Sequence, residues 1–252
     1  MLRQIAVPVL AVLAFLGFWE FIVWVNSWPN YKMASPSDLP AAYIRFWPLF
    51  LEMGWQTLWR TVAGLMIAVV FGTLLGMAMG FSKIARDALY PLLVGFNAVP
   101  KATLVPVIAL LFIGQHDFNT VLMAFLISFF PIAVSVGIGL STLEPEYRDI
   151  LRSLGASKVT IFRKIALPKT LPEFFGALKV AVTLAFIGTN LVEIVSPHGR
   201  GLGALFKSGE TNGDYPLMFA VLIALAFLGI VLYYAVVALE RIFAGWAERP
   251  QG

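Results

Sequence analysis

Residues Glu144 to Pro168 read EPEYRDILRSLGASKVTIFRKIALP and form the one long charged interval in an otherwise apolar chain. Apolar residues recur through it at helical spacing on both sides of Gly155. Glycine is the usual residue just past a helix end, because it enters the left-handed conformation without steric cost. Ser157 is suited to cap a second helix, which Leu167 and Pro168 are expected to stop. The stretch therefore predicts two short amphipathic helices joined by a tight turn.

The composition indicates a membrane protein. Of 252 residues, 60% are hydrophobic and 13% are charged, whereas soluble domains carry about 25% charged residues. So few charges could not cover a soluble surface, and the net charge of +4 is read as membrane topology and not as nucleic-acid binding. The chain has no cysteine and two histidines, so we expect no disulfide and no metal site.

Six apolar segments are long enough to cross a bilayer, for which about 20 residues are needed. They cover residues 5–25, 57–81, 89–113, 120–140, 171–194 and 216–239. The sequence therefore predicts an all-α, polytopic protein with one transmembrane domain over residues 1–252, in which 144–168 is a loop. A short surface helix is expected at residues 39–53, before the second span.

The distribution of lysine and arginine predicts the orientation. With the N-terminus inside, 11 basic residues lie in inner segments and 5 lie in outer segments or at outer span edges, Arg60 among them. Basic residues are enriched in cytoplasmic loops. Both termini and the 144–168 loop are therefore expected in the cytoplasm.

The charged loop resembles the cytoplasmic signature of binding-protein-dependent ABC importer permeases with the type I fold. That signature is Glu-Ala-Ala, three residues, Gly, nine residues, and Ile-x-Leu-Pro. Its spacing is matched by Gly155, Ile165, Leu167 and Pro168. Asp149 stands at the glutamate position, while Ile150 and Leu151 replace the two alanines. An ordinary charged loop between membrane helices is the alternative interpretation.

Other parts of the chain resemble the nitrate, sulfonate and taurine branch of these permeases. The resemblance runs from about Pro36 to Trp246 and includes the proline-rich third span. Its remaining motifs are Phe130-Pro131, Gly176 to Lys179, Glu193, Gly201 to Gly203, and Glu240-Arg241.

This resemblance implies a function for the loop. In such families the short helix after the glycine docks in a groove of a separate ATPase and transmits its motion. The coupling helix would here cover about Ser157 to Ile165. Its docking residues would be apolar Val159, Ile161 and Phe162, with Lys158, Arg163 and Lys164 on the polar rim.

The resemblance also implies the partners. The chain would be the permease subunit of an importer that moves a small organic or anionic solute inward by alternating access. It would lie in the bacterial inner membrane and work with a second permease copy, two cytoplasmic ATPase subunits and an extracytoplasmic binding protein. The chain has no Gly-x-x-x-x-Gly-Lys-Ser/Thr loop, so ATP and magnesium are expected on the ATPase subunits and no enzyme activity or cofactor is expected on this chain.

Span three is broken by prolines, and interior proline removes a backbone hydrogen bond and kinks a helix. Ionisable residues inside spans are candidates for function, so the expected translocation residues are Asn97, Pro100 and Lys101, with Glu193 near the outer end of span five. Lys101 attracts anionic solute, pairs with a carbonyl or extends to a membrane interface, and Glu193 is either a gate or a tether between helices.

Small residues recur every fourth position in span two: Gly64, Ala68, Gly72, Gly76 and Gly80. In a membrane such a face lets two backbones approach closely. The interpretation as a permease core helix and that of generic membrane packing both predict burial of this face.

Two other classes of function compete with the importer. An ion-driven secondary transporter is expected to show recognisable halves and paired midplane charges, and only Lys101 lies near the midplane. A membrane enzyme would need clustered His, Asp or Glu at one membrane face, and no such cluster is visible in the sequence.

Overall fold

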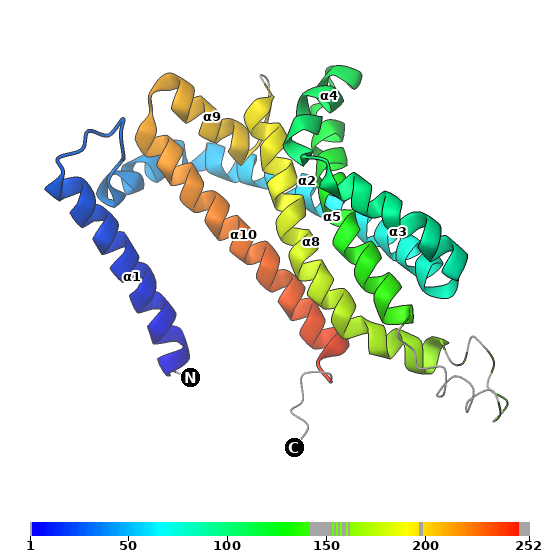
Figure 1. The fold of residues 1–252 in the computed structure, drawn as a ribbon. Helices are drawn as coiled ribbons and strands as arrows, with labels where there is room; N and C mark the ends of the chain where they lie inside the picture. The colour runs from blue at the N-terminus through cyan, green and yellow to red at the C-terminus, as the bar shows by residue number, and fades with distance from the viewer. Residues whose placement is uncertain are drawn as a thin grey trace.

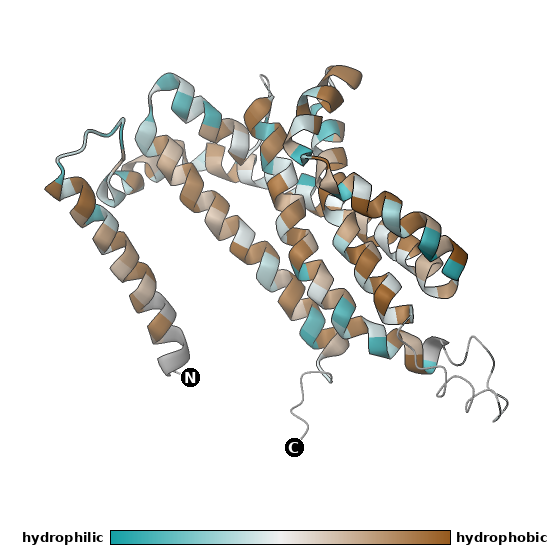
Figure 2. Ribbon diagram, viewed as in Figure 1, coloured by the Kyte–Doolittle hydropathy of each residue, from teal (hydrophilic) through white to brown (hydrophobic). Residues whose placement is uncertain are grey.

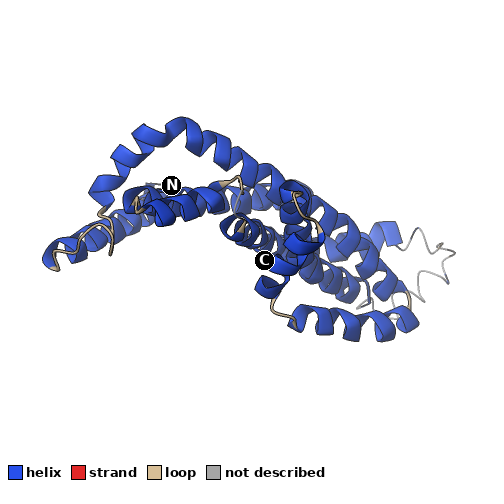
Figure 3. Cartoon of the chain, turned by 90° about the horizontal axis from the view of Figure 1, so that it is seen from above, coloured by secondary structure: helices blue, strands red, loops and turns tan. Residues whose placement is uncertain are grey.

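The computed structural model describes residues 2–141, 162–196 and 199–246, together with Ser153, Gly155, Ser157 and Thr160. All regular elements within this part of the chain are helical, and none is a strand (Figure 3). The prediction of an all-α protein is confirmed.

Eight α-helices make up the described fold. They are α1 (Leu2–Val25), α2 (Leu39–Phe81), α3 (Lys83–Ala98), α4 (Leu104–Leu111), α5 (His116–Ser141), α8 (Leu167–Val195), α9 (Leu202–Asn212) and α10 (Tyr215–Ala244). Helices α5, α8 and α10 run side by side and α1 stands apart from them, with α4 and α9 at one end and the start of α1 and the end of α10 toward the other (Figure 1). We name these the α9 end and the terminal end of the bundle.

Four of these helices are long and apolar enough to cross a membrane, and the bent pair of α3 and α4 adds a fifth candidate. The first predicted span lies in α1. Its apolar part, Leu10–Val25, is shorter than the helices that are long enough to cross a membrane. The count of six spans therefore stays a prediction. Most residues of the long helices are hydrophobic (Figure 2), and many of their large hydrophobic side chains are exposed, which fits a chain surrounded by lipid.

Helix α2 is longer than the sequence suggests. The surface helix expected at residues 39–53 and the span expected at 57–81 are one element of 43 residues, bent at Phe46, where φ is −113° and ψ is 16°. Pro48 lies two residues beyond this point, and its ring removes one helical hydrogen bond. The polar residues between the two segments do not interrupt the helix.

A tight seam between α2 and α5 forms the centre of the fold. A Cβ atom added to Gly76 would lie 2.6 Å from the Cβ of Val136, and one added to Gly72 would lie 2.8 Å from the carbonyl oxygen of Phe129. Gly64 and Gly80 are as closely covered, by Ala124 and Leu140 respectively. Ala68 is fully buried in the same seam. The small-residue face of span two is therefore buried, as both interpretations of its spacing require.

The break predicted from the prolines of span three is confirmed. Helix α3 ends at Ala98, a 3₁₀ turn covers Lys101–Thr103, and α4 leaves at an angle of 75° to α3. Pro100 stands at the break, because a proline disfavours helix in the residue before it. Pro91, by contrast, lies inside α3.

Candidate functional site

The coupling segment is described only in part. Gly155 has a φ of +81°, and the hydroxyl of Ser157 accepts a hydrogen bond of 3.2 Å from the backbone N–H of Thr160. The tight turn and the serine cap therefore form as predicted. Four of the predicted coupling residues lie outside the described residues: Asp149, Lys158, Val159 and Ile161.

The end of this segment differs from the prediction. Phe162–Ala166 form a π-helical turn, and the chain passes without a break into α8 at Leu167. The expected stop at Pro168 is wrong, because a proline in the first turn of a helix lacks only an N–H that needs no intrahelical partner. Ile165 is half-buried and Leu167 is exposed.

The predicted pathway residues at the break are exposed, apart from half-buried Lys101. The ammonium group of Lys101 donates to the carbonyl oxygens of Phe96, Asn97 and Val99 at 2.7, 2.9 and 3.0 Å. It thus satisfies the carbonyls left free at the C-terminal end of α3, where the helix dipole also favours a cation. Of the possibilities that the sequence leaves open for Lys101, the structure has the pairing with carbonyl oxygens. Asn97 and Pro100 lie at the same break.

Glu193 is the centre of a buried polar cluster at the α9 end. One of its oxygens accepts hydrogen bonds from the hydroxyl of Thr57 at 2.9 Å and from the backbone N–H of Gly203 at 3.0 Å. The other lies 3.3 Å from the guanidinium of Arg60. The side chains of Arg60 and Glu193 are only 3% and 1% exposed, so the pair joins α2, α8 and the start of α9 in a site that water does not reach.

Arg60 uses its whole guanidinium group in this cluster. Besides Glu193 it donates to the side-chain oxygen of Gln56, to the backbone carbonyl of Arg200 and, from two nitrogens, to Asp117. Asp117 lies in the first turn of α5, and its side chain is 61% exposed. Arg60 therefore links a buried carboxylate on α8 to a solvent-facing one on α5.

The turn between α8 and α9 closes directly over Glu193. Gly201 has a φ of +130°, and a Cβ atom there would collide with the Glu193 carboxyl group. The backbone N–H of Leu202 donates to the hydroxyl of Thr57 at 2.8 Å. Glu193 thus has the geometry of a tether, the second of the two roles that the sequence leaves open.

Comparison with known proteins gives the family. The family model described as "Binding-protein-dependent transport system inner membrane component" matches residues 68–245. A formylaminopyrimidine transport permease, ThiX of Halalkalibacterium halodurans, is 32% identical over 96% of both chains.

The chain belongs to this family. It is the membrane-spanning permease subunit of an ABC importer for a small solute. Family membership favours this function over that of an ion-driven secondary transporter. The permease is a multi-pass membrane protein, and members of its family lack an ATPase site of their own.

Further relatives agree with this assignment. The riboflavin transport permease RibX of Chloroflexus aurantiacus is 30% identical to the permease over 92% of this chain and 86% of its own length. The taurine transport permease TauC of Escherichia coli is 27% identical over 78% of this chain and 72% of its own length. An inward-facing structure of the MetNI methionine ABC transporter matches with a TM-score of 0.64 at 20% identity, over 78% of this chain and 96% of that one. The structural match shows the fold.

A second ion pair in the permease joins α8 to α10 nearer the terminal end. The Lys179 ammonium lies 2.8 and 3.0 Å from the two oxygens of Glu240. The two side chains are 26% and 10% exposed. Lys179 is therefore part of an ion pair between two helices.

Sequence reasoning did not single out Arg60, Asp117 or Thr57 as site residues, and it named Glu240 only as part of a family motif. Arg60 carried a usable signal, because an arginine within an apolar helix needs a buried partner, but it was counted as an outer topological charge. Its partner Glu193 is 133 residues away, and no local pattern connects the two.

Proposed function

We propose that the permease imports a small organic or anionic solute by alternating access. It works as a pair of copies in the bacterial inner membrane, with both termini in the cytoplasm. Two cytoplasmic ATPase subunits bind ATP and Mg²⁺ and dock on the 144–168 loop, and an extracytoplasmic binding protein delivers the solute. The 11 basic residues of the inner segments, against 5 outside, support this orientation.

The continuity of α8 carries this proposal. The π-helical turn that ends the coupling segment runs directly into α8, and 29 residues later the same helix ends at the Glu193 cluster. An α-helix is stiff over this length, so a push on Phe162–Ala166 is transmitted to the α9 end. This continuity supports the proposal, because one helix joins the segment proposed to dock the ATPase to the end of the permease at the Glu193 cluster.

The relatives narrow the chemical class of the solute. The permeases named for formylaminopyrimidine and riboflavin, both nitrogen heteroaromatic compounds, match more of this chain than those named for taurine and nitrate. Lys101, the cation nearest the middle of a span, already has its three donors on carbonyl oxygens. Both observations favour an organic solute over a simple anion, and the ligand that copurifies with the binding protein is the direct test.

The docking role of the loop is tested by Phe162→Asp. A charge placed in an apolar contact is costly, so this variant should lose its ATPase during purification. Ile44→Asp is the matched control, because Ile44 is an exposed apolar residue at the α9 end and should keep its ATPase. Retention of a full complement of ATPase by Phe162→Asp, with normal uptake, would show that the loop is not the docking element.

Gly155→Val tests how the loop transmits motion. A β-branched residue is strained at a φ of +81°, so the turn should aim the next helix wrongly. We expect ATPase to stay bound while solute uptake per ATP falls severalfold in reconstituted vesicles. An unchanged ratio of uptake to hydrolysis would mean that the turn geometry does not matter for coupling.

A further inference from the structure

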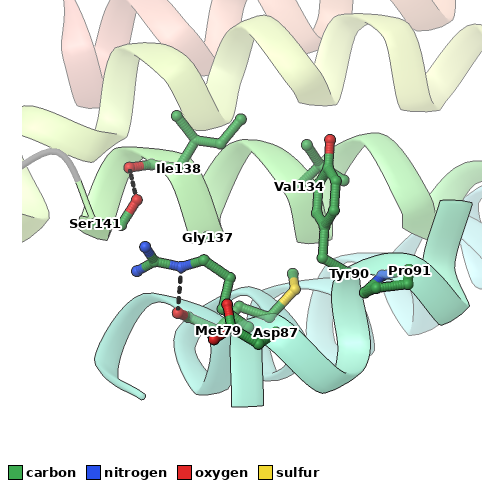
Figure 4. A pocket seen from close by; sticks show the side chains of 9 residues that line it. Met79, Asp87, Tyr90, Pro91, Val134, Gly137, Ile138 and Ser141 are labelled. Atoms are coloured by element: carbon green, nitrogen blue, oxygen red, sulfur yellow. Dashed lines mark hydrogen bonds between the residues drawn. The ribbon is translucent and has the colours of Figure 1, made fainter. Parts of the chain in front are cut away.

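A groove of about 380 Å³ lies at the terminal end of the bundle, between α5 and the connection from α2 to α3. Met79, Tyr90 and Val134 converge on the space between these helices (Figure 4). Nothing in the transport mechanism proposed above uses this groove. It is lined by Met79, Arg86, Asp87, Tyr90, Pro91, Val134, Gly137, Ile138 and Ser141.

The groove is polar at one end and apolar at the other. Ser141 is the last residue of α5, whereas Val134 lies two turns deeper on the same helix face, about 10 Å along the axis. Arg86 and Asp87 lie in the first turns of α3, while Tyr90 and Pro91 follow one turn further on. The polar end thus lies at the helix termini, where the membrane surface is expected, and the apolar end lies inside the bilayer.

The polar end carries one cation and one anion. The Nε atom of Arg86 donates to the carbonyl oxygen of Met79 at 3.1 Å, and neither terminal guanidinium nitrogen has a hydrogen-bond partner among the described residues. Asp87 is exposed and makes no ion pair with Arg86 or with any other described residue. Within the described part of the chain, the polar end of the groove therefore offers free guanidinium donors and a carboxylate without a cation, next to an apolar slot.

We propose that this groove binds a phospholipid with a phosphoethanolamine headgroup. The phosphate accepts hydrogen bonds from Arg86, the primary ammonium donates to Asp87, and an acyl chain enters the slot beside Val134 and Ile138. Basic pockets between helices at a membrane surface are suited to lipid phosphates. The adjacent carboxylate selects against a phosphoglycerol headgroup, which is anionic and has no cation to offer.

The exposed surface around the groove favours a lipid as its occupant. Ile84 and Leu92 on α3 are 82% and 68% exposed, so lipid tails already surround this helix in a membrane. Ile138 and Tyr90 on the groove walls are about half exposed. A chain from the surrounding bilayer reaches the slot without crossing a polar barrier.

The test uses the permease purified with its ATPase. The complex is incubated in detergent with equimolar phosphatidylethanolamine, phosphatidylglycerol and phosphatidylcholine, and the lipids that stay bound are identified by native mass spectrometry. We expect phosphatidylethanolamine to be enriched over both others, because the quaternary ammonium of phosphatidylcholine has no N–H to donate to Asp87. Asp87→Asn should reduce this enrichment about two- to fivefold, the size of an exposed ion pair.

Two further variants sharpen the test. Glu52→Gln removes an exposed carboxylate from α2 near the α9 end and should leave the lipid ratios unchanged. Val134→Phe fills the slot and should lower the retention of all three lipids, with the ATPase still bound.

Three outcomes would overturn the proposal. One is the same lipid ratio in the unaltered complex and in Asp87→Asn. A second is unchanged lipid retention in Val134→Phe together with lost pairing of permease copies, which would make the groove a surface between copies. The third is unchanged retention together with lost solute uptake, which would place the groove on the transport pathway.

Discussion

Helix α8 is held at two points by ion pairs of different kinds, at Glu193 near its C-terminal end and at Lys179 near its middle. At the α9 end, Glu193 has the guanidinium of Arg60, a hydroxyl and a backbone N–H as partners, and it is almost completely buried. Toward the terminal end, the ion pair between Lys179 and Glu240 stands without such further recorded partners and is partly exposed. The same helix is therefore fixed to α2 by a buried network of several partners and to α10 by a single ion pair that is partly open to solvent at Lys179.

This difference suggests where the permease can move. A buried charge left without its partner is costly, so the contact between α2 and α8 must persist through the transport cycle. A partly exposed pair can exchange its partner for water at little cost. We infer that α8 stays joined to α2 at the α9 end while its other end changes position relative to α10, which is where the coupling segment enters the helix.

The largest effect is expected from Arg60→Met. It leaves Glu193 buried without its cation, and removing one partner of a buried pair costs about 3–5 kcal/mol. The variant should unfold at a much lower temperature in detergent and give little assembled transporter. Arg45→Met is the control, because Arg45 is 74% exposed and lies 4.0 Å from Asp214. Equal stability of both variants would mean that the cluster at Glu193 contributes nothing to the fold.

A smaller loss is expected from Glu193→Gln. The amide keeps the volume of the side chain and can still accept from Gly203, but the charge-assisted hydrogen bond to Arg60 is lost, at a cost of about 1.5–3 kcal/mol. Thermal unfolding of the purified complex measures the loss. If Glu193→Gln loses as much unfolding free energy as Arg60→Met, the charge of the Glu193 carboxylate accounts for the stability of the cluster. The penalty for leaving a buried charge without its partner would then not be the main term.

The smallest effect on stability is expected from Lys179→Met, at about 1 kcal/mol or less, because the pair with Glu240 is partly open to solvent. Uptake per ATP should change clearly even though the unfolding temperature changes little, because we expect the contact between Lys179 and Glu240 to rearrange during transport. Lys207→Met, which removes a surface pair with Glu210, is the control and should alter neither property. If Lys179→Met lowers stability as much as Glu193→Gln does, the two contacts of α8 are equivalent and the comparison fails.

Much of the local structure could be predicted from the sequence. Apolar runs placed the long helices, the turn at Gly155 and the cap at Ser157 followed from residue type, and Pro100 marked the break in span three. The small-residue face of α2 was found because its four-residue spacing is a local pattern. In each of these cases the physical cause acts within a few neighbouring residues.

The candidate site was predicted less completely, because its contacts join distant segments. Glu193 could be singled out as a charge within a span, but its partners Thr57 and Arg60 lie on α2 and Gly203 lies on α9, and only the fold brings these helices together. Glu240 and Lys179 are 61 residues apart and carry no shared pattern. The two helical segments of α2 were separated in the prediction because hydropathy falls between them, although hydrogen bonding along the backbone continues.

The break in span three has an electrical consequence. Lys101 places a positive charge in the bent span, and its recorded hydrogen-bond partners are carbonyl oxygens and not carboxylates. Moving one elementary charge through a membrane potential of 100 mV is worth about 2.3 kcal/mol. If the break shifts along the membrane normal as the importer changes state, by a tenth of the potential drop for example, each copy contributes about 0.2 kcal/mol of voltage dependence. Uptake by this permease would then respond to the membrane potential even when the solute itself is uncharged.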